Sequence, residues 1–412
     1  MMNNKKEVEK IMKKNCLFLC VLMASLSFCA AKEVNYMEEK SEVRIQNVLA
    51  KIRRGEDVTV AVLGGSITTG YNSNPLEKNS WAAKTGEWFK NLAAKNKCKL
   101  TFLNEGVSGT DSAFAAARVK DHIINHNVDL VILEFSVNDL WLAPSVRNRT
   151  YEGVIRQIMN NSETAVLALF LNTKENGLPG QQNEQQKITD YYHIPFVSWK
   201  DCVLQGGTDI SAFDSFYDGA ETVHPNNAGH ASIAKYVINT LQGYWNNLPS
   251  DKKIEKPVKK LPAPFIDNSY EFVEYYHKDN LKPVQNDGWK EGTSRHDDWV
   301  KRGNVREGWQ TDKAGGEITF EVEGSVIGVT YCESDGFRNA MAWVTAPDGI
   351  ESEKIPLQCY VSYRNGYYGW AYKELVKGDK VQKYTVHIMC TKRAAADRNG
   401  KFCNITGILA GK

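Results

Sequence analysis

Apolar and polar positions along the chain follow two different patterns, which change near residue 250. Up to about residue 245, short apolar runs alternate with stretches of helical periodicity. The apolar runs are predicted strands at residues 58–63, 100–103, 130–135, 165–171 and 194–199. The stretches between and after them are predicted helices near residues 80–95, 113–126, 151–160, 183–192 and 227–245. This alternation predicts an α/β domain with a parallel sheet covered by helices on both faces.

In the last third of the chain, apolar and polar residues alternate one by one. Ile318, Phe320 and Val322 alternate with polar residues, and a second run over 384–388 repeats the pattern. Period two with glycine-containing turns is typical of antiparallel strands, so we expect residues 265–412 to form an antiparallel β-sandwich domain. The stretch before it, residues 249–264, is charged and bracketed by prolines, which predicts an exposed linker.

Residues 1–31 are expected to be a signal peptide, which leaves residues 40–248 as the first folded domain. Two lysines precede an apolar stretch over residues 17–28, and small residues follow it. The stretch is too short for a stable membrane helix, so we expect export to the periplasm, the cell surface or the medium. Cys29 closes a weak match to a bacterial lipoprotein box, and an association with the membrane is expected only if a lipid is attached there.

Composition and charge narrow the function classes. The chain has 412 residues, 42% of them hydrophobic and 24% charged, which is enough for two globular domains. A formal net charge of +2 indicates no nucleic-acid partner. The nine cysteines include no CxxC pair, so a cysteine zinc site is not expected, and disulfides and buried thiols both stay open.

Two histidines spaced for metal ligation are assigned to a solvated helix face. His122 and His126 lie four residues apart on a predicted helix, but the glutamate of the zinc-protease motif does not follow the first of them. His230, in the last predicted helix, is expected to pack or to cap. Neither a metal nor another cofactor is therefore predicted.

Candidate chemistry lies in two runs that are far apart in the sequence. The first follows the first predicted strand and reads Gly64-Gly65-Ser66-Ile67-Thr68. The second precedes the last predicted helix and reads Glu221-Thr222-Val223-His224-Pro225-Asn226. A serine hydroxyl is a weak nucleophile until a base takes its proton and a third group orients that base. The serine, histidine and acid of these runs supply the three groups of a serine hydrolase.

Two further strand ends offer groups that can stabilise negative charge. Gly109 follows the second predicted strand, and Asn138 follows the third. Reactive groups in parallel sheets gather beyond the carboxyl ends of the strands. The backbone N–H groups of Ser66 and Gly109 and the side-chain amide of Asn138 are thus predicted to form an oxyanion hole.

These four blocks resemble the SGNH, or GDSL-type, hydrolase family, in particular its branch with a Gly-Gly-Ser-Ile-Thr first block. The resemblance covers residues 57–245, about half of the chain, in the family's order and spacing. It implies a flavodoxin-like three-layer α/β/α domain with strand order 2-1-3-4-5. It also implies that Ser66 is the nucleophile, that Gly109 and Asn138 are oxyanion donors, and that His224 is first a general base and then a general acid.

The chain departs from the family pattern at three positions. Gly65 replaces the aspartate that names the GDSL group, Ser136 replaces a usual glycine, and Glu221 stands where the family has aspartate. Glu221 is one methylene longer, so it must fold back to reach Nδ1 of His224. Three alternatives stay open: Glu221 orients the histidine, Asp218 replaces it, or neither acid is used.

The aromatic residues of the second domain are open to two interpretations. Tyr367 and Trp370 lie in a segment crowded with tyrosines and glycines, and exposed rings of this kind can stack on sugars. Packing in the core or between the domains is favoured over that role.

The function that this combination favours is a serine esterase that removes small acyl groups, mainly acetyl, from a carbohydrate. The resemblance to bacterial carbohydrate O-acetyl esterases with an added β-sandwich supports it. One alternative is a lipid-directed esterase or lysophospholipase on the same fold. The other is a catalytically inert surface glycan-binding protein.

Overall fold

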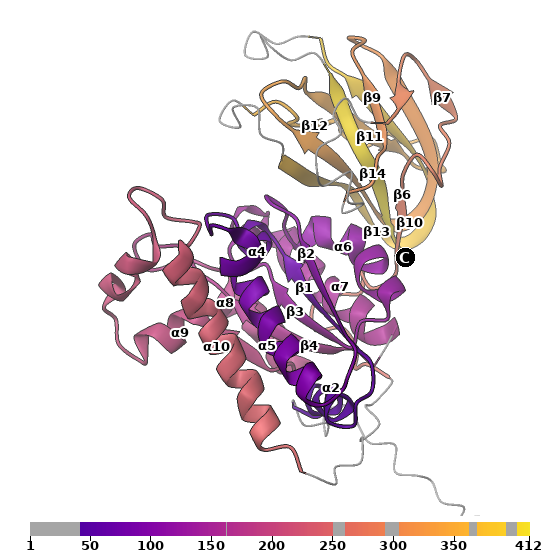
Figure 1. Cartoon of the computed structure of the whole chain (residues 1–412). Coiled ribbons are helices and arrows are strands. Elements are labelled where there is room, and N and C mark those ends of the chain that lie inside the picture. The colour runs from indigo at the N-terminus through magenta and orange to yellow at the C-terminus, as the bar shows by residue number, and fades with distance from the viewer. Residues whose placement is uncertain (1–41, 162, 250–259, 293–304, 362–368, 393–401) are drawn as a thin grey trace, which may run out of the picture.

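The computed structural model describes residues 42–161, 163–249, 260–292, 305–361, 369–392 and 402–412. The predicted signal peptide and Cys29 lie outside these residues, as does most of the predicted linker. The described chain forms an α/β domain and a C-terminal β domain, which lies beside helices α6 (Ser112–His122) and α7 (Pro144–Asn161) in Figure 1.

The α/β domain is built on a five-stranded parallel sheet. Its strand order is β2-β1-β3-β4-β5, which confirms the predicted flavodoxin-like arrangement. The strands are β1 Val58–Gly64, β2 Leu100–Gly106, β3 Leu130–Glu134, β4 Ala165–Phe170 and β5 Phe196–Ser198. Each of the five predicted strands overlaps an observed one.

Alternate residues of the strands serve two hydrophobic cores, one on each face of the sheet. On β1, Ala61 and Leu63 belong to the core shared with α6 and α7, whereas Val60 and Val62 belong to the opposite core. This alternation follows from the period of two in a strand. Both faces are therefore covered, which makes the domain a three-layer α/β/α structure.

Helices α2 (Val43–Arg53), α5 (Trp81–Lys95) and α10 (Asn227–Asn246) cover the second face and lie in front of the sheet in Figure 1. The other helical segments are α3 Ser66–Thr69, α4 Leu76–Asn79, η2 Ile124–His126, η3 Asn138–Trp141, α8 Gln182–Tyr191, α9 Trp199–Leu204 and η4 Ile210–Phe216. Helix α7 begins seven residues earlier than the prediction at 151, because Pro144 supplies the fixed φ that suits a first helical position.

Over its described residues, the β domain is one nine-stranded antiparallel sheet that curls around a single hydrophobic core. Its strands are β6 Val273–Tyr276, β7 Gln285–Asn286, β8 Lys290–Glu291, β9 Trp309–Thr311, β10 Glu317–Glu333, β11 Ala340–Thr345, β12 Ile355–Leu357, β13 Gly369–Cys390 and β14 Cys403–Gly411. The first half of β10 pairs with the end of β13, and its second half pairs with β14 and the start of β13. Register shifts near Gly324 separate the halves, and both halves bury side chains in one core, as the sandwich prediction requires.

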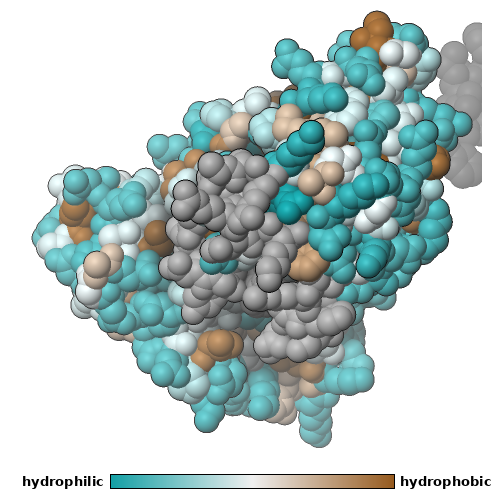
Figure 2. Space-filling view, turned by 90° about the horizontal axis from the view of Figure 1, so that it is seen from above, coloured by the Kyte–Doolittle hydropathy of each residue, from teal (hydrophilic) through white to brown (hydrophobic). Residues whose placement is uncertain are grey.

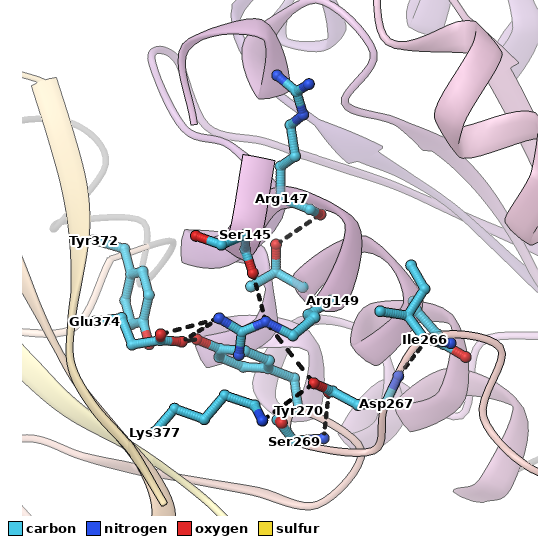
Figure 3. Close-up of polar contacts among 12 residues, drawn as sticks. Ser145, Arg147, Arg149, Ile266, Asp267, Ser269, Tyr270, Tyr372, Glu374 and Lys377 are labelled. Atoms are coloured by element: carbon cyan, nitrogen blue, oxygen red, sulfur yellow. Dashed lines mark hydrogen bonds and ion pairs between the residues drawn. The ribbon is translucent and has the colours of Figure 1, made fainter. Parts of the chain in front are cut away.

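The two domains meet through a largely buried polar cluster, drawn in Figure 3. Arg149 on α7 donates to both oxygens of Glu374 on β13, at 2.9 and 3.0 Å. Tyr270 donates to the same carboxylate at 2.5 Å, and its hydroxyl lies 2.8 Å from that of Tyr372. Gly153 leaves room for this arrangement, because a Cβ there would collide with the Cβ of Tyr270. Charged hydrogen bonds out of water thus fix the position of the β domain on α7.

The described end of the predicted linker is anchored to the α/β domain, although Lys260 and Ala263 are exposed as predicted. Leu261 is buried in the core of the α/β domain, and the carbonyl of Pro262 accepts a hydrogen bond from Arg156 at 3.0 Å. Further along, Glu152 on α7 accepts hydrogen bonds from the backbone N–H groups of residues 265–267. The prolines and charges that predicted an exposed segment gave no signal for these contacts, since they depend on polar groups of α7.

Glu374→Ala is expected to weaken the attachment of the β domain, because it leaves the guanidinium of Arg149 buried without its carboxylate. We expect a fall of about 2 kcal/mol in the free energy of unfolding, measured by chemical denaturation. Glu321→Ala, at an exposed position of β10, is the matched control and is expected to change little. Equal stability of the two variants would contradict the proposed role of this cluster.

Candidate active site

Ser66 and His224 lie together at the carboxyl end of the sheet. Ser66 begins α3 directly after β1, and His224 lies in the turn before α10. The Oγ of Ser66 is 2.9 Å from Nε2 of His224, within hydrogen-bonding distance. Burial lowers the pKa of His224 below its ordinary value, although Glu221 opposes this effect. The ring is therefore neutral near pH 7, the form that can accept a proton.

Glu221 folds back onto the backbone of its own turn. Its Oε1 accepts hydrogen bonds from the N–H groups of Thr222, Val223 and His224 at 3.1, 2.8 and 3.0 Å. The same oxygen is 3.4 Å from Nδ1 of His224. Burial alone raises the pKa of Glu221, but the N–H groups of Val223 and His224 and the charge of the ring hold it below its ordinary value. An ionised carboxylate thus faces Nδ1, and its extra methylene is accommodated by the three backbone donors.

Asp218, the alternative acid, is engaged elsewhere. Its Oδ1 accepts a hydrogen bond from the side-chain amide of Asn226 at 2.7 Å. Asn226 in turn caps α10, where its Oδ1 accepts from the N–H groups of Ala228 and Gly229. Asp218 is therefore part of the structure that sets the start of α10, and Glu221 is the acid that the fold places beside the histidine.

Asn138 and the Gly65–Ser66 turn are in contact. A Cβ at Gly65 would collide with Oδ1 of Asn138, so the glycine that replaces the family's aspartate makes room for this amide. Gly109 has a φ of +74°, a left-handed conformation that glycine adopts without steric cost. Val107, two residues earlier, donates its N–H to the carbonyl of Gly64 at 3.0 Å. The loops that carry the three predicted oxyanion donors are thereby joined at one edge of the sheet.

Glu134, at the end of β3, forms hydrogen bonds to these loops. It was not predicted to be a site residue. Its carboxylate is fully buried and accepts a hydrogen bond from Thr68 at 3.2 Å. Burial raises the pKa of Glu134 to about 7, while Thr68 and the N–H groups of Val137 and Gly65 oppose that shift. The sequence did contain a signal for Glu134, namely an acid at the end of a strictly apolar run. An acidic side chain is rarely buried unless it has polar partners there.

Ser136, another departure from the family pattern, has a structural role. Its hydroxyl donates to the carbonyl of Leu171 at 2.8 Å and accepts from the N–H of the same residue at 2.7 Å. It thus ties the loop after β3 to the end of β4. A glycine could make neither hydrogen bond.

The three other histidines that the sequence singled out are each accounted for by packing, by a polar partner or by exposure to solvent. His122 is only 6% exposed and its Nδ1 lies 2.8 Å from Glu105, so the predicted solvated position is wrong for it, whereas His126 is exposed. His230 is buried and packs as predicted, with hydrogen bonds to Trp81 and Tyr71. Within the described residues, no three His, Cys, Asp or Glu side chains are grouped to hold a metal ion. No disulfide bond joins the six cysteines in the described part of the chain.

Of the two interpretations of the aromatic residues, sugar stacking does not suit Trp370. Its side chain is 3% exposed and belongs to the core of the β domain, as do Trp289 and Trp309. Tyr372 is likewise buried and contacts Tyr270 between the domains. Packing therefore explains these rings, whereas Tyr367 lies outside the described residues.

Comparison with known proteins assigns the family of the first domain. A model of the GDSL-like Lipase/Acylhydrolase family matches residues 62–232, which include Ser66, Gly109, Asn138 and His224. The chain therefore contains a GDSL-like lipase/acylhydrolase domain, in agreement with the resemblance of its sequence blocks. No curated protein sequence matches the chain significantly.

Solved structures share the two-domain fold. A crystal structure of a two-domain esterase active on acetylated mannans superposes with a TM-score of 0.76, at 24% identity, over 91% of this chain and 96% of that chain. The structure of such an esterase co-crystallised with mannopentaose gives a TM-score of 0.74, at the same identity and coverage. The order of an α/β hydrolase domain and a β domain is thus shared over nearly the whole length.

None of the described helices is long and apolar enough to cross a bilayer.

Glu221→Gln is expected to lower kcat by roughly 10- to 100-fold, because an amide orients and stabilises the imidazolium less well than a carboxylate. Glu221 raises the pKa of His224. Loss of its charge should therefore move the acid limb of the kcat/KM profile to lower pH, as measured with p-nitrophenyl acetate.

Asp218→Asn is the matched control and is expected to leave that limb in place with a change in kcat below about 3-fold, since its partner is Asn226. A larger loss for Asp218→Asn than for Glu221→Gln would show that Asp218 is the orienting acid.

Proposed function

We propose that the protein is a serine esterase that removes acetyl groups from a carbohydrate through an acyl-enzyme intermediate. The observation that carries the proposal is the 2.9 Å contact between Ser66 Oγ and His224 Nε2, with the Glu221 carboxylate facing the other ring nitrogen. This contact lies within the acylhydrolase domain. This geometry supports the roles of Ser66 as nucleophile, His224 as base and Glu221 as orienting acid in acyl transfer.

In the proposed reaction, Ser66 Oγ attacks the ester carbonyl while His224 Nε2 takes its proton. The tetrahedral intermediate places its negative oxygen near Asn138 and the N–H groups of Ser66 and Gly109, where each donor contributes about 3 kcal/mol. Its collapse breaks the bond to the sugar oxygen, and His224 returns the proton to that oxygen. Water, deprotonated by His224, then attacks the acyl-enzyme. The bond between the acyl carbon and Ser66 Oγ breaks, His224 gives the proton to Oγ, and acetate is released.

A carbohydrate is the proposed substrate rather than a lipid for two reasons. The two solved structures with the same domain order are esterases active on acetylated mannans. In addition, Figure 2, which views the molecule from above the orientation of Figure 1, shows apolar side chains scattered among hydrophilic ones on the part of this face that is not grey. A long acyl chain needs a continuous apolar surface, whereas a polysaccharide binds to a polar one.

The inert alternative rests on the replacement of the family's aspartate by Glu221. The three backbone donors that hold Glu221 beside His224 weaken that argument, because they compensate for its length. The lysophospholipase alternative predicts a preference for long acyl chains. Export, and any lipid attachment at Cys29, remain proposals that rest on residues 1–31 of the sequence.

The proposed function is tested with acetylated mannan, acetylated xylan, p-nitrophenyl acetate and p-nitrophenyl decanoate. We expect release of acetate from at least one polysaccharide and a preference for acetate over decanoate. Ser66→Ala and His224→Ala should each abolish at least about 99.9% of turnover, and their combination should lose little more, because the two residues act as one unit. Preference for decanoate would support the lipid alternative, and no turnover by folded protein would support the inert one.

A further inference from the structure

Two large aromatic side chains are exposed beside the candidate active site. Tyr71 is 50% exposed and Trp141 is 65% exposed. Tyr71 follows the Ser66 helix α3, and Trp141 ends the helix η3 that Asn138 begins. The two rings therefore belong to the two segments that supply the nucleophile and an oxyanion donor.

Tyr71 is held beside the catalytic base. The centroids of its ring and the His224 ring are 4.5 Å apart, with the planes tilted by 53°. Its carbonyl accepts a hydrogen bond from Nε2 of His230 at 3.1 Å, and Asn72 donates to the carbonyl of His224 at 2.9 Å. Because His230 Nδ1 accepts from the N–H of Trp81, the proton of that ring must be on Nε2. The segment that carries Tyr71 is thus fixed from both sides.

Trp141 shares a face of η3 with Asn138. A 3₁₀-helix has about three residues per turn, so side chains at positions i and i+3 are eclipsed, and roughly 6 Å of rise separates them. Asn138 points toward the Gly65–Ser66 turn, since its Oδ1 is the atom that a Cβ at Gly65 would meet. The side chain of Trp141 therefore leaves η3 on the same side as that of Asn138, one turn further along, and most of it is exposed to solvent.

The proton transfers of the proposed reaction indicate which part of the substrate lies next to these rings. His224 returns its proton to the departing sugar oxygen, so that sugar must lie next to His224, where Tyr71 is exposed. The carbonyl oxygen of the acetyl group faces Asn138. The sugar units next to the acetylated one extend either past Asn138 or away from it. The apolar face of a pyranose matches an exposed aromatic ring, which gains contact area at a small entropic cost.

We propose that Tyr71 and Trp141 form a carbohydrate-binding subsite, in which Tyr71 stacks on the deacetylated sugar and Trp141 contacts a neighbouring sugar unit. This inference rests on the proposed carbohydrate esterase function. It assigns the stacking role to the α/β domain, whereas the sequence offered Tyr367 and Trp370 of the β domain as the less favoured alternative to packing. A subsite next to the base also accounts for the exposure of two large rings at this edge of the sheet.

The test compares Tyr71→Leu and Trp141→Leu with wild-type protein on acetylated manno-oligosaccharides and on p-nitrophenyl acetate, which has no sugar. Tyr71→Phe keeps the ring, and Phe272→Leu, a 55% exposed aromatic residue of the segment leading into β6, is the matched control. The measured quantity is kcat/KM on the oligosaccharide divided by kcat/KM on p-nitrophenyl acetate.

We expect this ratio to fall roughly 10-fold in each leucine variant, mainly through a higher KM on the oligosaccharide. Tyr71→Phe should keep at least about half of the wild-type ratio, and Phe272→Leu should match the wild type. An unchanged ratio in both leucine variants overturns the subsite. Wild-type protein that hydrolyses p-nitrophenyl acetate but none of the acetylated oligosaccharides overturns the proposed substrate, and with it the subsite.

Discussion

The contact between Ser66 Oγ and His224 Nε2 joins segments 158 residues apart, and the other parts of the site are arranged around it. The parallel sheet brings the two together, because the carboxyl ends of β1 and β3 and the turn before α10 meet at one edge. Two buried or half-buried acids then hold the parts in place. Glu221 collects three backbone N–H groups and faces the histidine, and Glu134 lies beneath the turns that lead to Ser66 and Asn138.

The β domain is also connected to this edge of the sheet. Val107, in the loop that carries Gly109, and Phe114, in the first turn of α6, are buried in the hydrophobic core of the β domain. The polar cluster of Arg149, Glu374 and Tyr270 fixes the same domain on α7. The loop that carries Gly109, a predicted oxyanion donor, is therefore packed between the two domains. A change in the docking of the domains would alter the packing of this loop and, through it, the site.

Much of the fold and the main candidate residues could be predicted from the sequence, because they depend on local signals. The apolar runs predicted the strands, and the positions just after three of these runs identified Ser66, Gly109 and Asn138 as site residues. The missed features depend on contacts between distant segments. Nothing local distinguishes the exposed Tyr71 from a core tyrosine, or the buried Trp370 from an exposed one. The start of α7 at Pro144 and the acid at Glu134 did carry local signals, namely a proline before a polar helix and a charge in an apolar run.

The role of Ser66 as the nucleophile activated by His224 is tested most directly by covalent labelling. The protein is incubated with diethyl p-nitrophenyl phosphate, whose phosphorus is attacked by an activated serine with loss of p-nitrophenolate, and the modified peptide is identified by mass spectrometry. We expect one stoichiometric diethylphosphoryl group on Ser66, and slow or absent labelling in His224→Ala. A label on another serine, or none in protein that still hydrolyses p-nitrophenyl acetate, would contradict it.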